Sequence, residues 1–334
     1  MLRPTLSLVI PFLNEEEVIP ELDRRLRKML EGVAVTWEVI FVNDGSSDQS
    51  LGLLQALAAG EPRYRILSLS RNFGHQIAVT AGLDHAAGEA VVVMDADLQD
   101  PPQIVVDMLA KWREGYDVVY GVRSRREGEG LFKRATAAIF YRLMRLMVGI
   151  DLPLDAGDFR LTSRRVVLAM RGLRETHRFV RGFVVWVGFK QTAVHHVRPG
   201  RLAGRTKYPL RKMMRFAVDG ITSFSIVPLR ISSLLGALSG AGAVGIGVWA
   251  VWVRFFVNGV VPGWTSVLLA ISLVAAAQFL MIGILGEYVG RIYEEVKRRP
   301  LYIVSDRQNL GADDPREDDP APPPGVRVIS KEDL

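Results

Sequence analysis

The 334-residue sequence contains no cysteine, which excludes disulfide bonds and thiolate metal sites. Its 5 histidines form no set with the spacing of metal ligands, and adjacent His195 and His196 would point to opposite faces of a strand. The basic residues, which give a net charge of +6, form no stripe with interleaved aromatics, so we expect no nucleic-acid partner. Residues 6–10 are too short for the apolar core of a signal peptide. We therefore expect the N-terminal part to stay in the cytosol.

Two long uncharged stretches, residues 231–253 and 255–286, are separated only by Arg254. Each can supply the roughly 20 apolar residues that cross a bilayer, although a buried core hairpin is the alternative. Basic residues precede the first stretch and follow the second, and the positive-inside rule therefore puts both flanks in the cytosol. The sequence thus predicts a multi-pass membrane protein, with two transmembrane helices within residues 231–286.

Upstream of these stretches, apolar runs typical of strands alternate with segments of helical period. The expected strands are residues 6–10, 38–42, 65–69, 90–94 and 118–120, with further strands at 155–162 and 184–195. The helices expected between the first five are residues 18–30, 49–59, 76–86 and 103–112. This alternation predicts an α/β domain with a mainly parallel sheet and helices on both faces.

The expected boundaries divide the chain into five parts. The cytosolic α/β domain is expected at residues 1–204, and an amphipathic juxtamembrane segment at 205–230. The two membrane helices take 231–286, and a basic cytosolic helix with an extension takes 287–305. The acidic, proline-rich residues 306–334 are expected to be a disordered tail.

Asp95 and Asp97 follow directly behind the strand expected at residues 90–94. The carboxyl ends of parallel strands are where open α/β sheets bind their ligands. Hard carboxylate oxygens suit Mg²⁺ or Mn²⁺, and Gln99 adds a neutral oxygen two residues on. A solvated acidic turn is the alternative for an isolated Asp-x-Asp. The other polar loops of this domain favour the metal site.

Two of these loops follow the first and second strands. Pro11, Asn14 and Glu15 follow the first, and residues 43–48 (NDGSSD) follow the second. Asp44 stands where it could accept hydrogen bonds from a nucleobase or ribose, and Gly45 permits a tight turn. Taken alone, each loop could equally be a turn that leads into a helix.

Together with Arg71-Asn72-Phe73-Gly74 and the run from Asp95 to Pro102, these loops form an ordered set of motifs. The chain resembles family 2 glycosyltransferases of the GT-A fold, and more narrowly the polyprenyl-phosphate glycosyltransferases related to dolichyl-phosphate mannose synthase, of the bacterial two-span type. The match runs from about residue 6 to 304 and includes residues 157–161, 177–182, 204–210 and 286–295. One position departs from it, since Leu13 stands where relatives usually carry tyrosine.

The resemblance implies inverting transfer of a sugar from a UDP-sugar, with UDP-glucose as the best guess, to undecaprenyl phosphate at the cytosolic membrane face. It implies that Mg²⁺ or Mn²⁺ is held by Asp95, Asp97 and Gln99, and that the nucleotide sugar is bound by Pro11, Asn14, Glu15, Asp44, Asp95 and Asp97. A bound metal stabilises the diphosphate that leaves. The acceptor phosphate is largely ionised at neutral pH, so it needs positioning more than deprotonation.

The predicted catalytic residues are Asp97, which holds the metal and the diphosphate, and Asp158 and Arg123 on the acceptor side. The predicted ligands of the acceptor phosphate are basic side chains that can hold two anions close together: Arg123, Arg134, Arg178, Arg205 and Lys207, with Arg181 as a further candidate. Asp158 is expected either to shape the acceptor site or to cap the turn that follows it.

Several alternatives stay open at this point. The donor could be GDP-mannose, a UDP-aminopentose or UDP-galactose, and the chain could be a non-catalytic membrane scaffold. A processive polysaccharide synthase would carry Gln-x-x-Arg-Trp, which is absent from the sequence. Residues 125–129 could close over the donor, and residues 288–299 could pair with a second protomer or lie along lipid.

Overall fold

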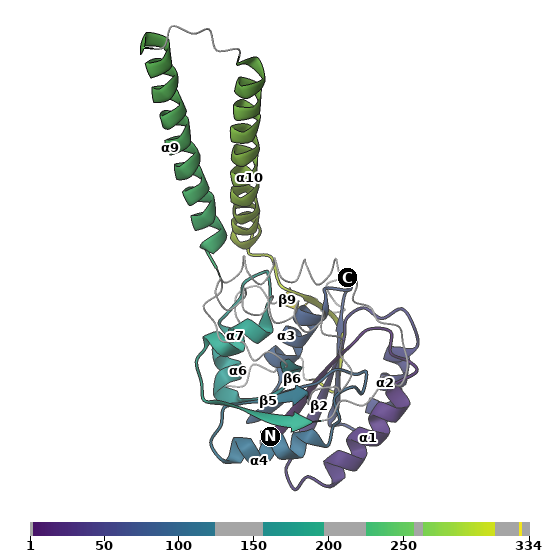
Figure 1. Ribbon diagram of the computed structural model, residues 1–334. Helices are drawn as coiled ribbons and strands as arrows, with labels where there is room; N and C mark the ends of the chain where they lie inside the picture. Colours follow the sequence, from purple (N-terminus) through teal and green to yellow (C-terminus); the bar gives the residue numbers. More distant parts are fainter. Residues whose placement is uncertain (1–2, 124–155, 197–224, 257–262, 311–326, 329–334) are drawn as a thin grey trace. The chain divides into compact units, whose positions relative to one another are not determined.

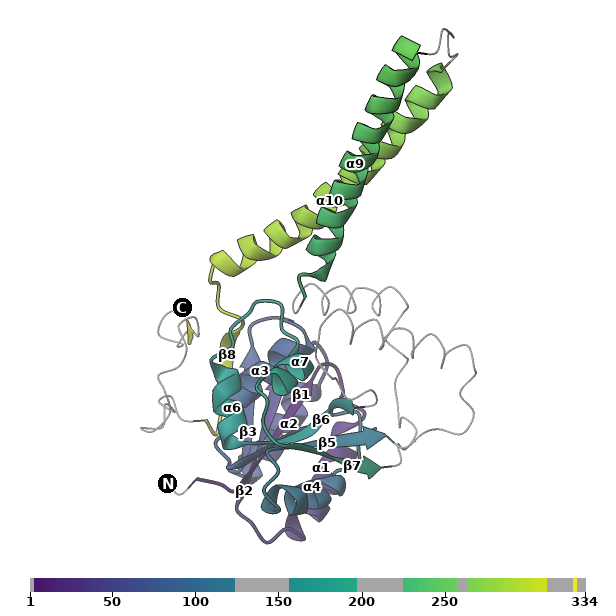
Figure 2. The ribbon, with the colours of Figure 1, turned by 60° about the vertical axis from the view of Figure 1, so that its left-hand side comes forward.

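The computed structural model describes residues 3–123, 156–196, 225–256, 263–310 and 327–328. The chain divides into two compact units. The first contains an α/β domain, which includes the segment after residue 298, and the second contains a pair of long helices. Figures 1 and 2 show these elements from two directions.

The centre of the sheet is parallel. Strands β4 (Ala90–Val93), β1 (Leu6–Phe12), β2 (Trp37–Asn43) and β3 (Tyr64–Leu69) lie side by side in this order. The chain therefore moves from β1 through β2 to β3 on one side and returns to β4 on the other. The reversal between β1 and β4 is a topological switch point, and ligands of open α/β sheets bind at the carboxyl ends of strands at such a point.

Further strands extend the sheet on both sides. Strand β6 (Ala156–Ser163) is antiparallel to β4 and to β5 (Val118–Arg123), which in turn runs parallel to β7 (Gln191–His196). At the other side β8 (Ile303–Gln308) is antiparallel to β3, and the short β9 (Arg327–Val328) pairs with β8. The expected class, an α/β domain with a mainly parallel sheet, is present.

Helices cover both faces of the sheet. Helices α1 (Ile19–Glu31), α2 (Ser50–Gly60) and α4 (Ile104–Arg113) share one hydrophobic core with the side chains of Leu8 and Ile10. Helix α3 (His75–His85) packs on β1 and β2 from the opposite face. The approach is close, since a Cβ at Gly82 would lie 2.2 Å from Val9 Cγ1. Helices α6 (Arg164–Arg171) and α7 (Val180–Trp186) precede β7 in the chain.

The second unit contains α9 (Val227–Phe256) and α10 (Trp264–Val296). Within them Val227–Trp249 and Ala270–Val296 have mean hydropathies of 1.7 and 1.8, and by length and composition they could cross a membrane. The Tyr288 hydroxyl donates a hydrogen bond of 2.6 Å to the carbonyl oxygen of Ser225. The expected pair of apolar helices is therefore present, and α10 continues without a break to Val296, through residues that were expected to form a basic helix after the second span.

Two expectations about secondary structure are wrong. The strand expected over residues 184–195 begins only at Gln191, because Val184–Trp186 belong to α7 and Gly188 then turns the chain with φ +74°. The expected disordered tail from Asp306 is also displaced, since the edge strand β8 continues to Gln308. The tail at 311–326 and 329–334, and the juxtamembrane residues 205–224, lie outside the described residues.

Candidate active site

The loops that follow β1 and β2 are joined by hydrogen bonds. Asn14, which has a left-handed φ of +55°, accepts a hydrogen bond of 2.8 Å from the Ser47 N–H through Oδ1. The Glu15 N–H donates to Ser50 Oγ at 2.8 Å. Pro11 is buried in β1, where it pairs in register with Val42. The structure thus brings the predicted nucleotide-binding loops together at the carboxyl ends of adjacent strands.

Asp44 holds a third loop in place. Its Oδ1 accepts a hydrogen bond of 2.7 Å from the Phe73 N–H, and its Oδ2 accepts one of 3.1 Å from the Gly74 N–H. Burial raises the pKa of Asp44, while these two backbone donors oppose the rise. Gly45 is required beside it, because φ is +76° and a Cβ would lie 2.7 Å from the Arg71 carbonyl carbon. Asp44 therefore fixes the loop between β3 and α3, a contact that the sequence did not predict.

The loop after β4, residues 94–103, carries the predicted metal ligands, and we name it the metal loop. The Gln99 N–H donates to Asp97 Oδ1 at 3.1 Å, and Leu98 between them has φ +56°. Gln99 is buried, whereas Asp95 and Asp97 are partly exposed. Burial, together with the nearby Asp158 and Asp97 carboxylates, raises the pKa of Asp95, against the opposing charge of His75.

This loop fits a divalent cation. Asp95 Oδ1 is buried and accepts no hydrogen bond from the part of the chain that is described. No group of three or more His, Cys, Asp or Glu side chains among those same residues forms a complete metal cluster. Asp95, Asp97 and the Gln99 amide would supply three oxygen donors, and a cation of the Mg²⁺ type usually takes its other ligands from water and substrate phosphates.

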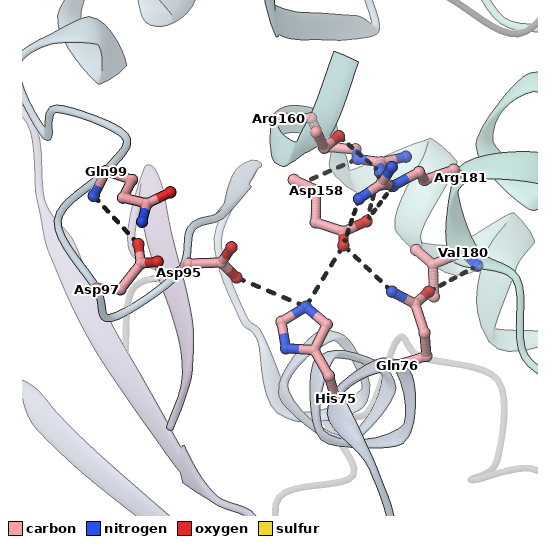
Figure 3. A network of polar contacts seen from close by, with 10 residues as sticks. His75, Gln76, Asp95, Asp97, Gln99, Asp158, Arg160, Val180 and Arg181 are labelled. Atoms are coloured by element: carbon pink, nitrogen blue, oxygen red, sulfur yellow. Dashed lines mark hydrogen bonds and ion pairs between the residues drawn. The ribbon is translucent and has the colours of Figure 1, made fainter. Parts of the chain in front are cut away.

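Asp158, on β6, is surrounded by hydrogen-bond donors (Figure 3). We name this group the Asp158 cluster: Asp158 with Arg160, Arg181, Gln76 and His75. Asp158 Oδ1 lies 2.9 Å from Arg181 Nε and 3.1 Å from Arg160 Nη2, and Oδ2 lies 3.1 Å from Arg181 Nη2 and 3.2 Å from Gln76 Nε2. Burial opposes ionisation of Asp158, but the Arg181 charge and the hydrogen bonds from His75 and Arg181 hold the pKa of Asp158 well below its usual range. Both oxygens of the Asp158 carboxylate therefore accept hydrogen bonds, which suits Asp158 to holding cationic side chains rather than to accepting a proton.

His75 joins the metal loop to this cluster. Its Nε2 lies 3.5 Å from Asp95 Oδ1 and 3.4 Å from Asp158 Oδ2 (Figure 3). Burial alone would lower the pKa of His75, but the hydrogen bond to Asp158 and the charges of both carboxylates raise it to about 9. The two carboxylates therefore favour the protonated form of the imidazole. The sequence analysis considered His75 only as a metal ligand and rejected it, and its only other signal was a place directly after the Arg71–Gly74 motif.

The predicted phosphate ligands have different surroundings. Arg181 is partly exposed, with 36% of its side chain accessible, whereas 2% of the Arg178 side chain is accessible. Arg178 Nε donates to Thr80 Oγ1 at 3.1 Å, and its guanidinium lies 4.6 Å from the centre of the Phe183 ring. Arg178 thus packs inside the domain, which does not favour the predicted contact with an acceptor phosphate.

Arg123 is the last residue of β5 and pairs in register with His196. The remaining predicted ligands, Arg134, Arg205 and Lys207, lie outside the described residues, as does the loop at 125–129. His196 itself contacts the metal loop, because its Nε2 lies 3.2 Å from Asp100 Oδ1, and both side chains are buried. The sequence analysis had considered His196 only as a metal ligand and had rejected it.

The class that these observations define is an α/β domain in which the loop with Asp95, Asp97 and Gln99 follows β4 at the switch point, and His75 links this loop to the Asp158 cluster. The family model described as Glycosyl transferase family 2 matches residues 7–170. An uncharacterized glycosyltransferase, YkcC of Bacillus subtilis, is 50% identical over 89% of this chain and 92% of its own length. The chain belongs to glycosyltransferase family 2, which confirms the predicted enzyme class, and the predicted α/β domain with a mainly parallel sheet is present.

Other relatives match over a similar length. An uncharacterized glycosyltransferase of Synechocystis sp. is 44% identical over 91% of this chain and 96% of its own length. A prophage bactoprenol glucosyl transferase homolog of Escherichia coli is 40% identical over 90% of this chain and 98% of its own. These matches extend beyond the α/β domain and include the segment that contains α9 and α10.

Proposed function

We propose that this protein transfers a sugar from a nucleotide-sugar donor to a polyprenyl phosphate at the cytosolic face of the bacterial inner membrane. The observation that carries the proposal is the metal loop beside the Asp158 cluster, since the reaction must hold a diphosphate and a second phosphate close together. The similarity to proteins named bactoprenol glucosyl transferase supports the acceptor, and it favours glucose as the sugar. UDP-glucose is therefore the donor that we propose, with GDP-mannose and a UDP-aminopentose as alternatives.

On the donor side, Asp95, Asp97 and Gln99 would hold Mg²⁺ or Mn²⁺, which when bound stabilises the negative charge of the leaving diphosphate. Asp44, Pro11, Asn14 and Glu15 would contact the nucleoside. Two of these loops are already fixed: Asn14 is bonded to the loop after β2, and Asp44 to the loop after β3.

The acceptor phosphate attacks the anomeric carbon of the sugar. One of its oxygens forms the new carbon–oxygen bond, and the bond to the diphosphate breaks, with its electron pair leaving on the diphosphate. No base is required, because the second pKa of a phosphate monoester is about 6. Asp158, whose carboxylate oxygens already accept hydrogen bonds, is not suited to act as a base, and this agrees with a reaction that needs none. We assign it the task of holding Arg181 for the acceptor, with Arg123, Arg134, Arg205 and Lys207 as further proposed ligands.

Helices α9 and α10 would anchor the enzyme in the bilayer in which a polyprenyl phosphate is dissolved. Their apolar side chains support this role: Leu234, Phe279 and Ile282 are 59%, 73% and 61% exposed. Such surfaces would be costly in water, and they match the lipid tails of a membrane.

A transfer assay tests the proposal. Full-length protein would be incubated with UDP-glucose, undecaprenyl phosphate and Mn²⁺, and the lipid products measured by mass spectrometry. Asp97→Ala should lower the rate about 100-fold or more, since metal stabilisation of a leaving group contributes several kcal/mol. Asp107→Ala, which removes an exposed carboxylate on α4, is the matched control and should keep the wild-type rate. An Asp97→Ala protein as active as the wild type would refute the metal assignment.

A further inference from the structure

The side-chain amide of Gln76 connects three elements of the α/β domain. Gln76 is the second residue of α3, and its Nε2 donates a hydrogen bond of 3.2 Å to Asp158 Oδ2 on β6. Its Oε1 accepts a hydrogen bond of 3.1 Å from the N–H of Val180, the first residue of α7 (Figure 3). One planar group therefore sets the distance between β6 and the start of α7.

This arrangement fixes Arg181 from two directions. Arg181 directly follows Val180, so Gln76 holds the backbone beside it. The Arg181 guanidinium donates from Nε to Asp158 Oδ1 at 2.9 Å and from Nη2 to Asp158 Oδ2 at 3.1 Å. Gln76 donates to the same carboxylate. Of the two arginines that pair with Asp158, Arg181 is 36% accessible and Arg160 only 2%, so Arg181 is the one that a ligand can reach.

Gln76 is itself held in place by the predicted donor side of the site. Gly74, two residues earlier, has a φ of +101°, and its N–H donates to Asp44 Oδ2. The N–H of Phe73 donates to the same carboxylate. Asp44, in the loop after β2, therefore holds the two residues that precede α3, and Gln76 follows as the second residue of that helix.

We propose that Gln76 is a positioning residue, which sets the Arg181 guanidinium for the anionic phosphate of the acceptor. This inference rests on the proposed function. Glutamine does not titrate and is not expected to touch the reacting atoms, so it would act through Asp158 and Arg181. Pre-organisation of this kind lowers the cost of immobilising a long side chain when the ligand binds.

The test compares two glutamines that both anchor α7. Gln191 Nε2 donates to the carbonyl oxygen of Val184 at 3.2 Å, and Gln191 Oε1 accepts a hydrogen bond of 2.7 Å from the Tyr120 hydroxyl. Neither hydrogen bond is to a member of the Asp158 cluster. Gln76→Leu should raise the KM for undecaprenyl phosphate about tenfold, because a hydrogen bond to a charged group is lost. The KM for the donor should stay within about twofold of the wild-type value. Gln191→Leu should leave both KM values near wild type. An equal loss in the two variants would mean that Gln76 only stabilises α7.

A double-mutant cycle with Arg181→Ala gives the decisive result. If Gln76 acts through Arg181, Gln76→Leu should have little further effect on the acceptor KM in the Arg181→Ala background. Effects that multiply in the double variant would overturn the inference while the proposed function stands. A wild-type protein that forms no lipid product would instead overturn the proposed function, and the inference with it. Thermal unfolding of each variant shows whether it is folded.

Discussion

Replacement of Asp158 by asparagine is expected to destabilise the α/β domain as well as to inactivate the enzyme. The reason is Arg160, whose side chain is 2% accessible and whose Nη1 has no hydrogen-bond partner within the described residues. Arg160 donates hydrogen bonds to Oδ1 and to the main-chain oxygen of Asp158. It also donates to the Gly157 carbonyl oxygen at 3.2 Å. Asp158→Asn would leave this buried charge without a counter-ion.

Breaking a buried ion pair by removing one partner costs about 3–5 kcal/mol. The pair with Arg181 adds little to this figure, because Arg181 is more than one-third exposed and solvent screens its charge. In a domain of this size, each kcal/mol lowers the Tm by about 2–4 °C. We therefore expect the Tm of Asp158→Asn to fall by roughly 6–20 °C, measured by circular dichroism on full-length protein in detergent.

Two comparisons make this prediction sharp. Asp97→Asn, at a partly exposed carboxylate, should lose activity without a comparable fall in Tm. Adding Arg160→Met to Asp158→Asn should restore part of the lost stability, since it removes the uncompensated charge. An Asp158→Asn protein with the Tm of the wild type and no activity would refute the reasoning, because the role of Asp158 would then be purely chemical.

Three further changes should have measurable effects. Gly45→Ala should lower the free energy of unfolding by about 1 kcal/mol or more, and weaken donor binding in calorimetry, because φ is +76° and the new Cβ would lie 2.7 Å from the Arg71 carbonyl carbon. Burial and the neighbouring Asp84 raise the pKa of Tyr302 well above its ordinary value of 10.0. The protonated Tyr302 hydroxyl therefore stabilises the fold fully below pH 10, and this stabilisation is lost as the pH rises further. Denaturant unfolding of Tyr302→Phe should therefore show a weaker decline of stability above pH 10 than the wild type, and parallel declines would contradict this assignment. Asn309→Ala removes two hydrogen bonds of 2.8 Å to backbone carbonyls and should speed amide exchange in β8, whereas unchanged exchange would argue against its anchoring role.

Much of the fold could be predicted from local sequence patterns. The buried parallel strands β1, β2 and β4 are continuous apolar runs, and they lie within two residues of their predicted ends. The errors occurred where distant contacts decide the structure. Strand β8 exists because it pairs with β3, and Ser305 bonds to a carbonyl 237 positions earlier in the chain. No local pattern around Asp306 indicates that pairing.

The residues of the candidate site also fall into those that local sequence patterns indicate and those that depend on distant contacts. Asp95, Asp97 and Asp44 could be predicted because each follows an apolar strand, and topology then brings their loops to one edge of the sheet. Gln76 was missed because it is a single polar residue whose contacts lie 82 and 104 positions away. Arg178 was predicted as a phosphate ligand from its motif, but its burial depends on the packing of Thr80 and Phe183, which the sequence does not reveal.

The most direct test of the proposed function is a transfer assay over a panel of donors. Full-length protein, undecaprenyl phosphate and Mg²⁺ or Mn²⁺ would be incubated separately with UDP-glucose, UDP-galactose, a UDP-aminopentose and GDP-mannose. Mass spectrometry of the lipids should reveal a single sugar linked to undecaprenyl phosphate from one donor, with release of its nucleoside diphosphate. A protein that binds UDP in a cation-dependent manner, yet forms no lipid-linked sugar from any of the four donors, would contradict the account and favour a scaffold.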